Sequence, residues 1–548
     1  MKTRQSYAWD RETTLVCQLA AAASLFSFLF YFRSGDLLLY GDAVAHINIA
    51  RRVIDSQTPG LLQLGTVWLP LPHLLMIPFL LSDAAWRTGI AGSLPSMCAY
   101  VFGTVGIFRL VRTKLSLSDQ PDVASRLAAW FAAATYAANP NLLYLQATAM
   151  TEVLLSAFFI WAIVHFSEFV RAVHASENDT ASSSLTKCGL CLAASALTRY
   201  DGWFLAGAIC LAVAGIVVRS NQPALRRSFA KFILIVAAAP VLWLTYNSAI
   251  YRNPLEFANG PYSARAIEQK TALFQSEPHP GWHNLHVSFT YFLKAAQDNV
   301  AEGKLQKVWL AFLLIGALAV WQRRSWPMLL LFLPLAFYTL SVAYGSVPIF
   351  LPEWWPFSYY NVRFGSELIP AFAVATAVSL YLAYIRANAA RVRTALIVGF
   401  VAFVAASYGW AWKAQPICFR EAQVNSRTRI SFERELAATL LKLPHDSTLL
   451  MYLGDHVGAL QDAGIPLRRV INEGNHRPWK RPTDPDGLWE QALANPARYA
   501  DYAIAIDQDA VAQGMNKQGL ISMVVVHSEG QPPATIYWTG KPATSNQH

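Results

Sequence analysis

Long runs of apolar residues recur along the first three quarters of the chain. Examples are residues 15–32, 232–250, 328–343 and 371–385. A helix needs about 20 residues to cross roughly 30 Å of hydrocarbon, and several runs reach or approach that length. Because the runs recur, the pattern predicts an α-helical polytopic membrane protein rather than a soluble protein with one anchor.

Clusters of basic residues separate many of the apolar runs, and the positive-inside rule places such clusters in the cytoplasm. The short connections between them carry almost no Lys or Arg, apart from Arg199 and Arg363. The alternation predicts about eleven spans, a cytoplasmic N-terminus and an outer location after residue 412. The basic clusters are Lys2/Arg4/Arg11, Arg109/Arg112/Lys114/Arg126, Arg171/Lys187, Arg219/Arg226/Arg227/Lys231, Arg323/Arg324 and Arg386/Arg391/Arg393. The expected spans are 13–32, 89–109, 126–143, 150–169, 186–200, 203–219, 231–250, 306–321, 327–345, 366–385 and 394–412.

Two longer connections, residues 33–88 and 251–305, are predicted outer loops. Within the first, residues 43–55 place apolar and polar side chains at helical spacing, which is typical of a helix lying on a membrane surface. Residues 67–81 are apolar but short and contain three prolines. If this segment crossed the membrane, every later basic cluster would move outside, so we expect an interfacial or re-entrant piece.

After residue 412 the apolar spans stop and strand-like and helix-like segments alternate. This pattern predicts a transmembrane part at 1–412 and a small α/β domain at 413–548 on the outer face. We expect this domain to act as a lid, a docking element or an acceptor-recognition module. Strands are expected near 448–453, 467–471, 502–506, 523–527 and 535–538, with helices near 431–443, 455–463 and 485–495.

The composition agrees with a membrane protein. Hydrophobic residues make up 54% of the chain and charged residues only 14%, against roughly 25% charged in soluble domains. The net charge of +10 follows from the cytoplasmic clusters and gives no reason to expect a nucleic-acid partner. The six cysteines are scattered, and Cys188 and Cys191 lie in an apolar helix, where packing is a better interpretation than redox or metal chemistry.

Ionisable residues near the outer ends of the predicted spans are the candidates for chemistry. They are Asp42, Glu152, Asp201, Glu353 and Arg363. Charges at membrane depth are costly, so a functional role is the default hypothesis, and a helical bundle can gather such residues around one cavity. The alternative is that each side chain reaches water from the end of a span.

A lipid-linked sugar donor would present its phosphate at the membrane surface. Transfer needs a carboxylate that takes a proton from the acceptor hydroxyl, and Asp42 can serve. It also needs cations for the phosphate leaving group, and guanidinium groups match phosphate oxygens; Arg199, Arg265 and Arg363 are candidates. A structural ion pair with Glu353 or Glu367 is the alternative for Arg363. His46 lies four residues after Asp42, on the same helical face. Two potential ligands at this spacing are a weak signal, so the sequence leaves open whether a metal ion binds.

The order of several motifs resembles a known family. The motifs are GDAVAH at 41–46, LPLPHLL at 69–75, NP at 139–140, TEVLL at 151–155 and ALTRYDG at 196–202. In this order they resemble GT-C glycosyltransferases, in the branch of protein O-mannosyltransferases and lipid A aminoarabinose transferases. The resemblance covers roughly residues 10–410.

The resemblance implies a polyprenyl-phosphate-sugar donor, a lipid, glycan or protein acceptor, and a bacterial-type inner membrane. It places Asp42 at the catalytic acid's position and Glu152 at the second acidic position, with Asp201 as a third candidate. The expected donor-binding residues are His46, Arg199, Arg265 and Arg363. Many relatives carry adjacent acidic residues in the first loop, whereas this chain has a lone Asp, so a divalent metal is left open.

Two other functions fit a polytopic membrane protein. A transporter or lipid flippase should show internal repeats and interrupted helices near the midplane, but no repeat is visible and the ionisable residues gather at the outer side. An assembly or sensor protein would use the outer domain as its working part and would tolerate changes at Asp42.

Overall fold

The computed structural model describes residues 9–115, 122–220, 222–272, 277–323, 325–475, 486–520 and 522–540. Lys2, Arg4 and Arg324 of the basic clusters lie outside the described residues, as does the first residue of the helix expected at 485–495. The chain divides into two compact units. Unit 1 comprises residues 1–36, 93–241 and 264–421, and unit 2 comprises residues 37–92, 242–263 and 422–548.

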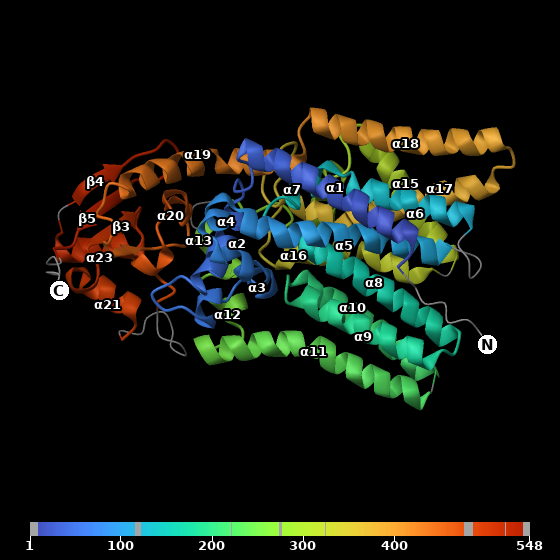
Figure 1. The fold of residues 1–548 in the computed structure, drawn as a ribbon, viewed down its shortest axis with the longest axis horizontal. Helices are drawn as coiled ribbons and strands as arrows, with labels where there is room; N and C mark the ends of the chain where they lie inside the picture. Colours follow the sequence, from blue (N-terminus) through green and yellow to red (C-terminus); the bar gives the residue numbers. More distant parts are fainter. Residues whose placement is uncertain are drawn as a thin grey trace. The chain divides into compact units, whose positions relative to one another are not determined.

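Unit 1 is a bundle of helices, drawn lengthwise in Figure 1. Its most buried members are α8 (Glu152–His174), which packs on α9, and α17 (Ile369–Arg386), which packs on α6 and α15. Both are mostly apolar, as expected for helices in the middle of a bundle. The remaining helices are α1 (Arg11–Ser34), α5 (Ile90–Leu115), α6 (Val123–Ala137), α7 (Pro140–Leu145), α9 (Asn178–Ala196), α10 (Asp201–Ser220), α11 (Pro223–Tyr251), α13 (Ala264–Ala272), α14 (Leu285–Asp298), α15 (Leu305–Gln322), η3 (Trp326–Phe332), α16 (Leu333–Tyr344), η4 (Val362–Leu368), α18 (Ala390–Lys413) and the first residues of α19 (Ile417–Leu440). Unit 2 includes α11 after residue 241 and α19 after residue 421.

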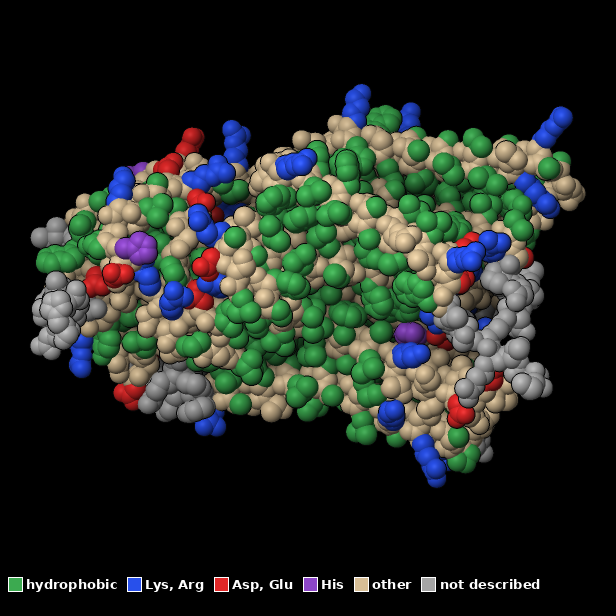
Figure 2. Space-filling model, in the orientation of Figure 1, with side chains coloured by type: hydrophobic (Ala, Val, Ile, Leu, Met, Phe, Trp, Pro, Cys, Tyr) green, Lys and Arg blue, Asp and Glu red, His purple; other side chains and the backbone are tan. Residues whose placement is uncertain are grey.

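Nine helical segments within the described residues are long and apolar enough to cross a membrane. Two of the expected spans are missing from this set. The first, α6, has 15 residues, and the second, α9, begins with the polar run NDTASSS. Apolar side chains gather on the face of this unit shown in Figure 2. The exposed apolar side chains of α1 include Leu25, Phe26 and Phe30. The polytopic helical architecture is therefore confirmed.

Unit 2 contains the predicted C-terminal α/β structure (red in Figure 1). Its five-stranded sheet has the order β2-β1-β3-β5-β4, with parallel pairs around β1 and antiparallel pairs around β5. The strands match the expected positions: β1 (Leu449–Met451), β2 (Val470–Ile471), β3 (Tyr502–Ile506), β4 (Ser522–Val526) and β5 (Ala534–Trp538). The helices beside them are α20 (Gly458–Ala463), η5 (Leu467–Arg469), α21 (Leu488–Ala494), α22 (Pro496–Tyr499) and α23 (Ala510–Gln518).

The first long loop packs with this sheet in unit 2. It forms α2 (Gly41–Arg52), η1 (Leu61–Leu64), α3 (Leu71–Met76), η2 (Ile77–Leu81) and α4 (Asp83–Thr88), and residues 242–263 add α12 (Glu256–Asn259). The amide of Asn48 donates to Gln461, and Arg52 pairs with Glu473. The compact units therefore group residues 37–92 with the C-terminal sheet, whereas the sequence suggested a boundary at residue 412.

The helix expected at 43–55 forms, but its apolar face is not free to lie on lipid. Ile47 and Ala50 are completely buried within the protein. They are buried because α2 packs against α3 and η1 in the same unit. The apolar segment 67–81 is short and broken, as expected, because Pro78 lies at the start of η2.

Candidate functional site

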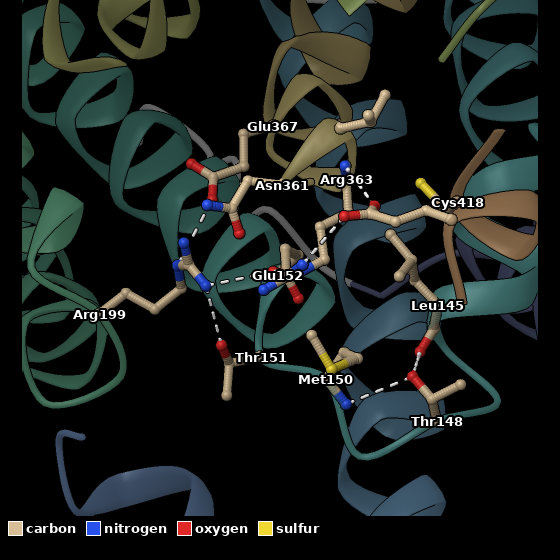
Figure 3. Close-up of polar contacts among 12 residues, drawn as sticks. Leu145, Thr148, Met150, Thr151, Glu152, Arg199, Asn361, Arg363, Glu367 and Cys418 are labelled. Atoms are coloured by element: carbon tan, nitrogen blue, oxygen red, sulfur yellow. Dashed lines mark hydrogen bonds and ion pairs between the residues drawn. The ribbon is translucent and has the colours of Figure 1, made fainter. Parts of the chain in front are cut away.

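Four of the predicted site residues meet in one buried cluster of unit 1. Glu152 and Asp201 occupy the first turns of α8 and α10, where the positive end of a helix dipole favours a carboxylate. Arg199 lies just before α10, and Arg363 lies in η4. Figure 3 shows Arg199 and Arg363 converging on Glu152. We refer to these residues, with their partners Tyr338, Glu367 and Glu421, as the arginine–carboxylate cluster.

Arg199 is surrounded by oxygen acceptors. Its Nη1 lies 3.2 Å from Oε1 of Glu152 and 3.1 Å from the hydroxyl of Thr151. Its Nε lies 3.3 Å from Oδ2 of Asp201 and 3.5 Å from Oε1 of Glu367. Its Nη2 donates to the hydroxyl of Tyr338 over 3.0 Å. The guanidinium group is therefore already neutralised by protein carboxylates.

Arg363 bridges two carboxylates from distant segments. Its Nε lies 3.1 Å from Oε1 of Glu152, and its Nη1 lies 3.2 Å from Oε1 of Glu421. The backbone N–H of Arg363 also donates to Oε2 of Glu421 over 3.1 Å. The expected structural partners were Glu353 or Glu367; the ion pairs found join Arg363 to Glu152 and Glu421, while Glu353 pairs with Lys294 at 2.5 Å.

Tyr338 ties the second side of the cluster together. Its hydroxyl lies 2.8 Å from Oδ2 of Asp201 and 2.7 Å from Oε1 of Glu367. A tyrosine carries one hydroxyl proton, so the two carboxyl groups share a single donor. On the opposite side, Oε2 of Glu152 is buried and has no hydrogen-bond partner among the described residues. The cluster thus leaves one carboxylate oxygen available to a further donor.

Asp42 and His46 belong to a different cluster, in unit 2. Both lie on α2, with Asp42 partly exposed in the first turn and His46 buried one turn later. Nδ1 of His46 lies 2.9 Å from Nε2 of His73, and the Trp68 ring covers His46 at 4.4 Å between centroids. We refer to His46, Trp68 and His73, together with Asp42 one helical turn before His46, as the histidine cluster.

His73 is completely buried, and its Nδ1 has no hydrogen-bond partner among the described residues. Burial lowers the pKa of His73 well below its usual value, and the neighbouring His46 and Arg52 lower it further. His73 is therefore neutral near pH 7. The Nε of Arg52 is likewise buried and has no hydrogen-bond partner among the described residues. Its Nη1 lies 3.1 Å from Oε1 of Glu473.

The other candidate cation, Arg265, lies on α13 in unit 1. Its side chain is exposed, and it makes no ion pair within the part of the chain that the structure describes. Of the three predicted phosphate partners, Arg265 is therefore the one that has no ion pair with the described residues. No group of three or more His, Cys, Asp or Glu side chains in the described ranges is arranged to hold a metal ion.

Sequence reasoning missed several members of the two clusters. Tyr338 lies inside an apolar span and gives no local signal. Glu421 follows the last expected span, where a charged residue is ordinary, yet it is completely buried. His73 had a usable signal, since it is a histidine within an apolar, proline-rich segment. Arg52, whose charge acts on His73 from outside the histidine cluster, had no signal, because it looked like the polar side of a surface helix.

The fold is similar to solved structures of one protein over almost its whole length. No protein-family model and no curated protein matches the chain. The structure of ArnT from Cupriavidus metallidurans in the apo state matches with a TM-score of 0.58 and 15% identity, covering 96% of this chain and 98% of that chain. The structure of the same ArnT bound to undecaprenyl phosphate matches with a TM-score of 0.57 and 14% identity, covering 94% and 97%. At this identity, the comparison establishes the shared fold.

Proposed function

We propose that this chain is a membrane glycosyltransferase that moves a sugar from a polyprenyl-phosphate donor to an extracytoplasmic acceptor. The observation that carries the proposal is the fold shared, over nearly the full length of both chains, with an ArnT whose structure was also determined with undecaprenyl phosphate bound. The order of acidic motifs from residue 41 to residue 202 supports it independently. Fold alone does not define chemistry, so the residues must account for the reaction.

In this proposal Asp42 acts as the general base. Its carboxylate accepts the proton of the acceptor hydroxyl, the acceptor oxygen attacks the anomeric carbon, and the bond from that carbon to the donor phosphate oxygen breaks. Polyprenyl phosphate leaves with the bonding electrons. The position of Asp42 supports the role, because the side chain is partly exposed at the start of α2 and lies one helical turn from buried His46.

The donor phosphate needs cationic partners. The candidate arginines differ in whether a protein carboxylate already pairs with them. We assign Arg265 as a direct phosphate partner, because it is exposed and without an ion pair among the described residues. Arg199 and Arg363 also remain candidates for donor binding, but a phosphate would have to displace Glu152 from them. His46 is retained in the donor-binding set, and neutral His73 positions it through their 2.9 Å contact.

We assign the arginine–carboxylate cluster a positioning role. Glu152 and Asp201 are bonded to arginines inside unit 1, so they are less suited than Asp42 to take up a proton. The cluster holds the first turns of α8 and α10 against η4, since its members come from all three segments. If Asp42 proves dispensable, Glu152 is the next candidate, because its second carboxylate oxygen is unpaired among the described residues.

The proposed location is a bacterial-type inner membrane, with a cytoplasmic N-terminus and an extracytoplasmic C-terminal domain. The alternating basic clusters support this orientation. The acceptor is a lipid, a glycan or a protein at the outer surface.

The test uses the full-length protein in sealed proteoliposomes with a panel of polyprenyl-phosphate sugars, including mannose and aminoarabinose forms. Released polyprenyl phosphate and glycosylated or free sugar are measured by mass spectrometry. We expect release with one donor, and loss of release in Asp42→Asn. Movement of an intact donor across the bilayer, with no polyprenyl phosphate released from any donor, would indicate a flippase and overturn the proposal.

A further inference from the structure

A surface hollow lies at the end of α9 opposite to Arg199. Its volume is about 390 Å³, and it is lined by one carboxylate, three hydroxyls and two lysines: Asp179, Ser182, Ser183, Thr186, Lys187 and Lys231. The first five come from α9 and the last from α11. Asp179 lies in the first turn of α9, where the positive end of the helix dipole favours a carboxylate.

A contact between the two helices at Gly189 brings the lysines near one another. Gly189 of α9 faces α11, and a Cβ there would lie 3.1 Å from the Phe232 ring and 3.3 Å from Ile235. The missing side chain therefore allows α11 to approach. Lys187 precedes Gly189 by two positions and Lys231 directly precedes Phe232, so the contact fixes both cations beside the hollow.

An exposed leucine follows each lysine on the same helical face. Leu190 and Leu234 come three residues after Lys187 and Lys231, and residues at this spacing are neighbours on a helix. Leu190 is 57% exposed and Leu234 is 73% exposed. Only 22% of the most apolar stretch of α11 is buried within the protein, as expected for a helix that faces lipid. Each helix thus presents a cation beside the hollow and an exposed leucine one turn further along.

We propose that this hollow binds the headgroup of an anionic phospholipid of the phosphatidylglycerol type. The phosphate lies between Lys187 and Lys231, and an acyl chain follows Leu190 and Leu234. A bare phosphate would be repelled by Asp179, whereas a headgroup hydroxyl donates a hydrogen bond to that carboxylate. The chemistry therefore favours a phosphate that carries a glycerol over a phosphate alone.

The test measures binding of single lipids to the delipidated full-length protein by native mass spectrometry. We expect phosphatidylglycerol to bind more tightly than phosphatidylethanolamine or phosphatidylcholine. Lys187→Gln with Lys231→Gln should weaken it about 30-fold, the size expected for two lysines at an anionic surface. Lys304→Gln with Lys307→Gln is the matched control, because it removes two exposed lysines at the start of another apolar helix. Equal binding of the three lipids, or an equal loss in the control, would overturn the proposal.

Two further measurements distinguish a lipid ligand from a soluble phosphate. Leu190→Ser with Leu234→Ser should weaken phosphatidylglycerol while keeping both lysines, and glycerol phosphate without acyl chains should bind much more weakly than the lipid. If glycerol phosphate binds as tightly as the lipid, the hollow is a soluble-phosphate site and the proposal is wrong. All four substituted side chains are exposed, so unchanged melting temperatures are expected and binding is compared only between folded samples.

Discussion

Glu152 and Arg363 lie 211 positions apart in the sequence, yet Nε of Arg363 is 3.1 Å from Oε1 of Glu152. The same oxygen is 3.2 Å from Nη1 of Arg199. One carboxylate oxygen therefore compensates two guanidinium groups from two other segments of unit 1. Since these groups are largely buried, the loss of this carboxylate leaves two cations undercompensated in a medium of low dielectric constant.

Glu152→Gln should destabilise the protein strongly. Glutamine keeps the shape but removes the charge that both arginines share, and breaking a buried ion pair typically costs about 3–5 kcal/mol. The melting temperature in detergent should fall by several degrees. Glu353→Gln is the control, since Glu353 pairs with Lys294 but its side chain is 52% exposed, and such pairs contribute about 0–1 kcal/mol. Equal melting temperatures for the two variants would contradict the structural role of Glu152.

Asp42→Asn should lower turnover about 10²–10⁴-fold, the usual contribution of a general base. Asparagine keeps the shape, and the partly exposed position in the first turn of α2 tolerates an uncharged residue. Melting temperature and donor affinity should therefore stay near those of the unchanged protein. Both are measured on the sample used for the turnover assay. Near-normal turnover in folded Asp42→Asn would remove Asp42 from the mechanism.

Arg265→Ala should weaken donor binding by roughly 10–100-fold, the size of a lost hydrogen bond to a charged group. Arg265→Lys should recover part of the affinity, because it keeps the charge but not the two-pronged geometry. Neither variant should lower the melting temperature, because the side chain is exposed. Unchanged donor affinity in Arg265→Ala, measured by titration with a polyprenyl-phosphate sugar, would return the phosphate site to Arg199 and Arg363.

His73 should make the protein less stable as pH falls. The buried ring, beside His46 and Arg52, has its pKa held well below the usual 6.5. The folded state therefore stays unprotonated while the unfolded state takes up a proton below about pH 6.5. The contribution of neutral His73 to the free energy of unfolding is therefore complete above about pH 6.5. Below that pH the free energy of unfolding falls by up to about 1.4 kcal/mol per pH unit.

This pH dependence is measured as the difference in melting temperature between the unchanged protein and His73→Gln from pH 8 to pH 5. The variant should lose less stability over the acidic part of this range. His445→Gln is the control, since its ring is 96% exposed, and it should keep the original slope. A His73→Gln profile parallel to that of the unchanged protein would show that folding does not change the proton binding of His73, and would contradict this prediction.

Fusions after Trp412 test the proposed orientation. An alkaline phosphatase fused there should be active in intact cells, because the basic clusters predict that the following domain lies outside. A fluorescent protein that matures only in the cytoplasm should stay dark at the same position. The reverse pattern would invert the topology and place Asp42 on the cytoplasmic side.

The sequence by itself determined the helical membrane architecture and the secondary structure of the C-terminal domain. Apolar runs such as 232–250 predict long helices, because the pattern is contained in residues that are neighbours in the chain. The strands β1, β3 and β5 are predicted by short apolar segments between turn residues. The sequence also placed Asp42 and His46 on one face of a helix, since residues four apart are neighbours there. Each of these inferences depends on residues close together in the chain.

Only the tertiary structure decided which side chains share a site. Glu421 reaches Arg363, His46 reaches His73, and Gln461 reaches Asn48, a pair 413 positions apart. Hydropathy and spacing carry no information about such pairs, because distant segments meet only when helices and loops pack. The same packing buried the apolar face of α2 within protein, since amphipathic spacing shows that a face must be covered without specifying whether lipid or protein covers it.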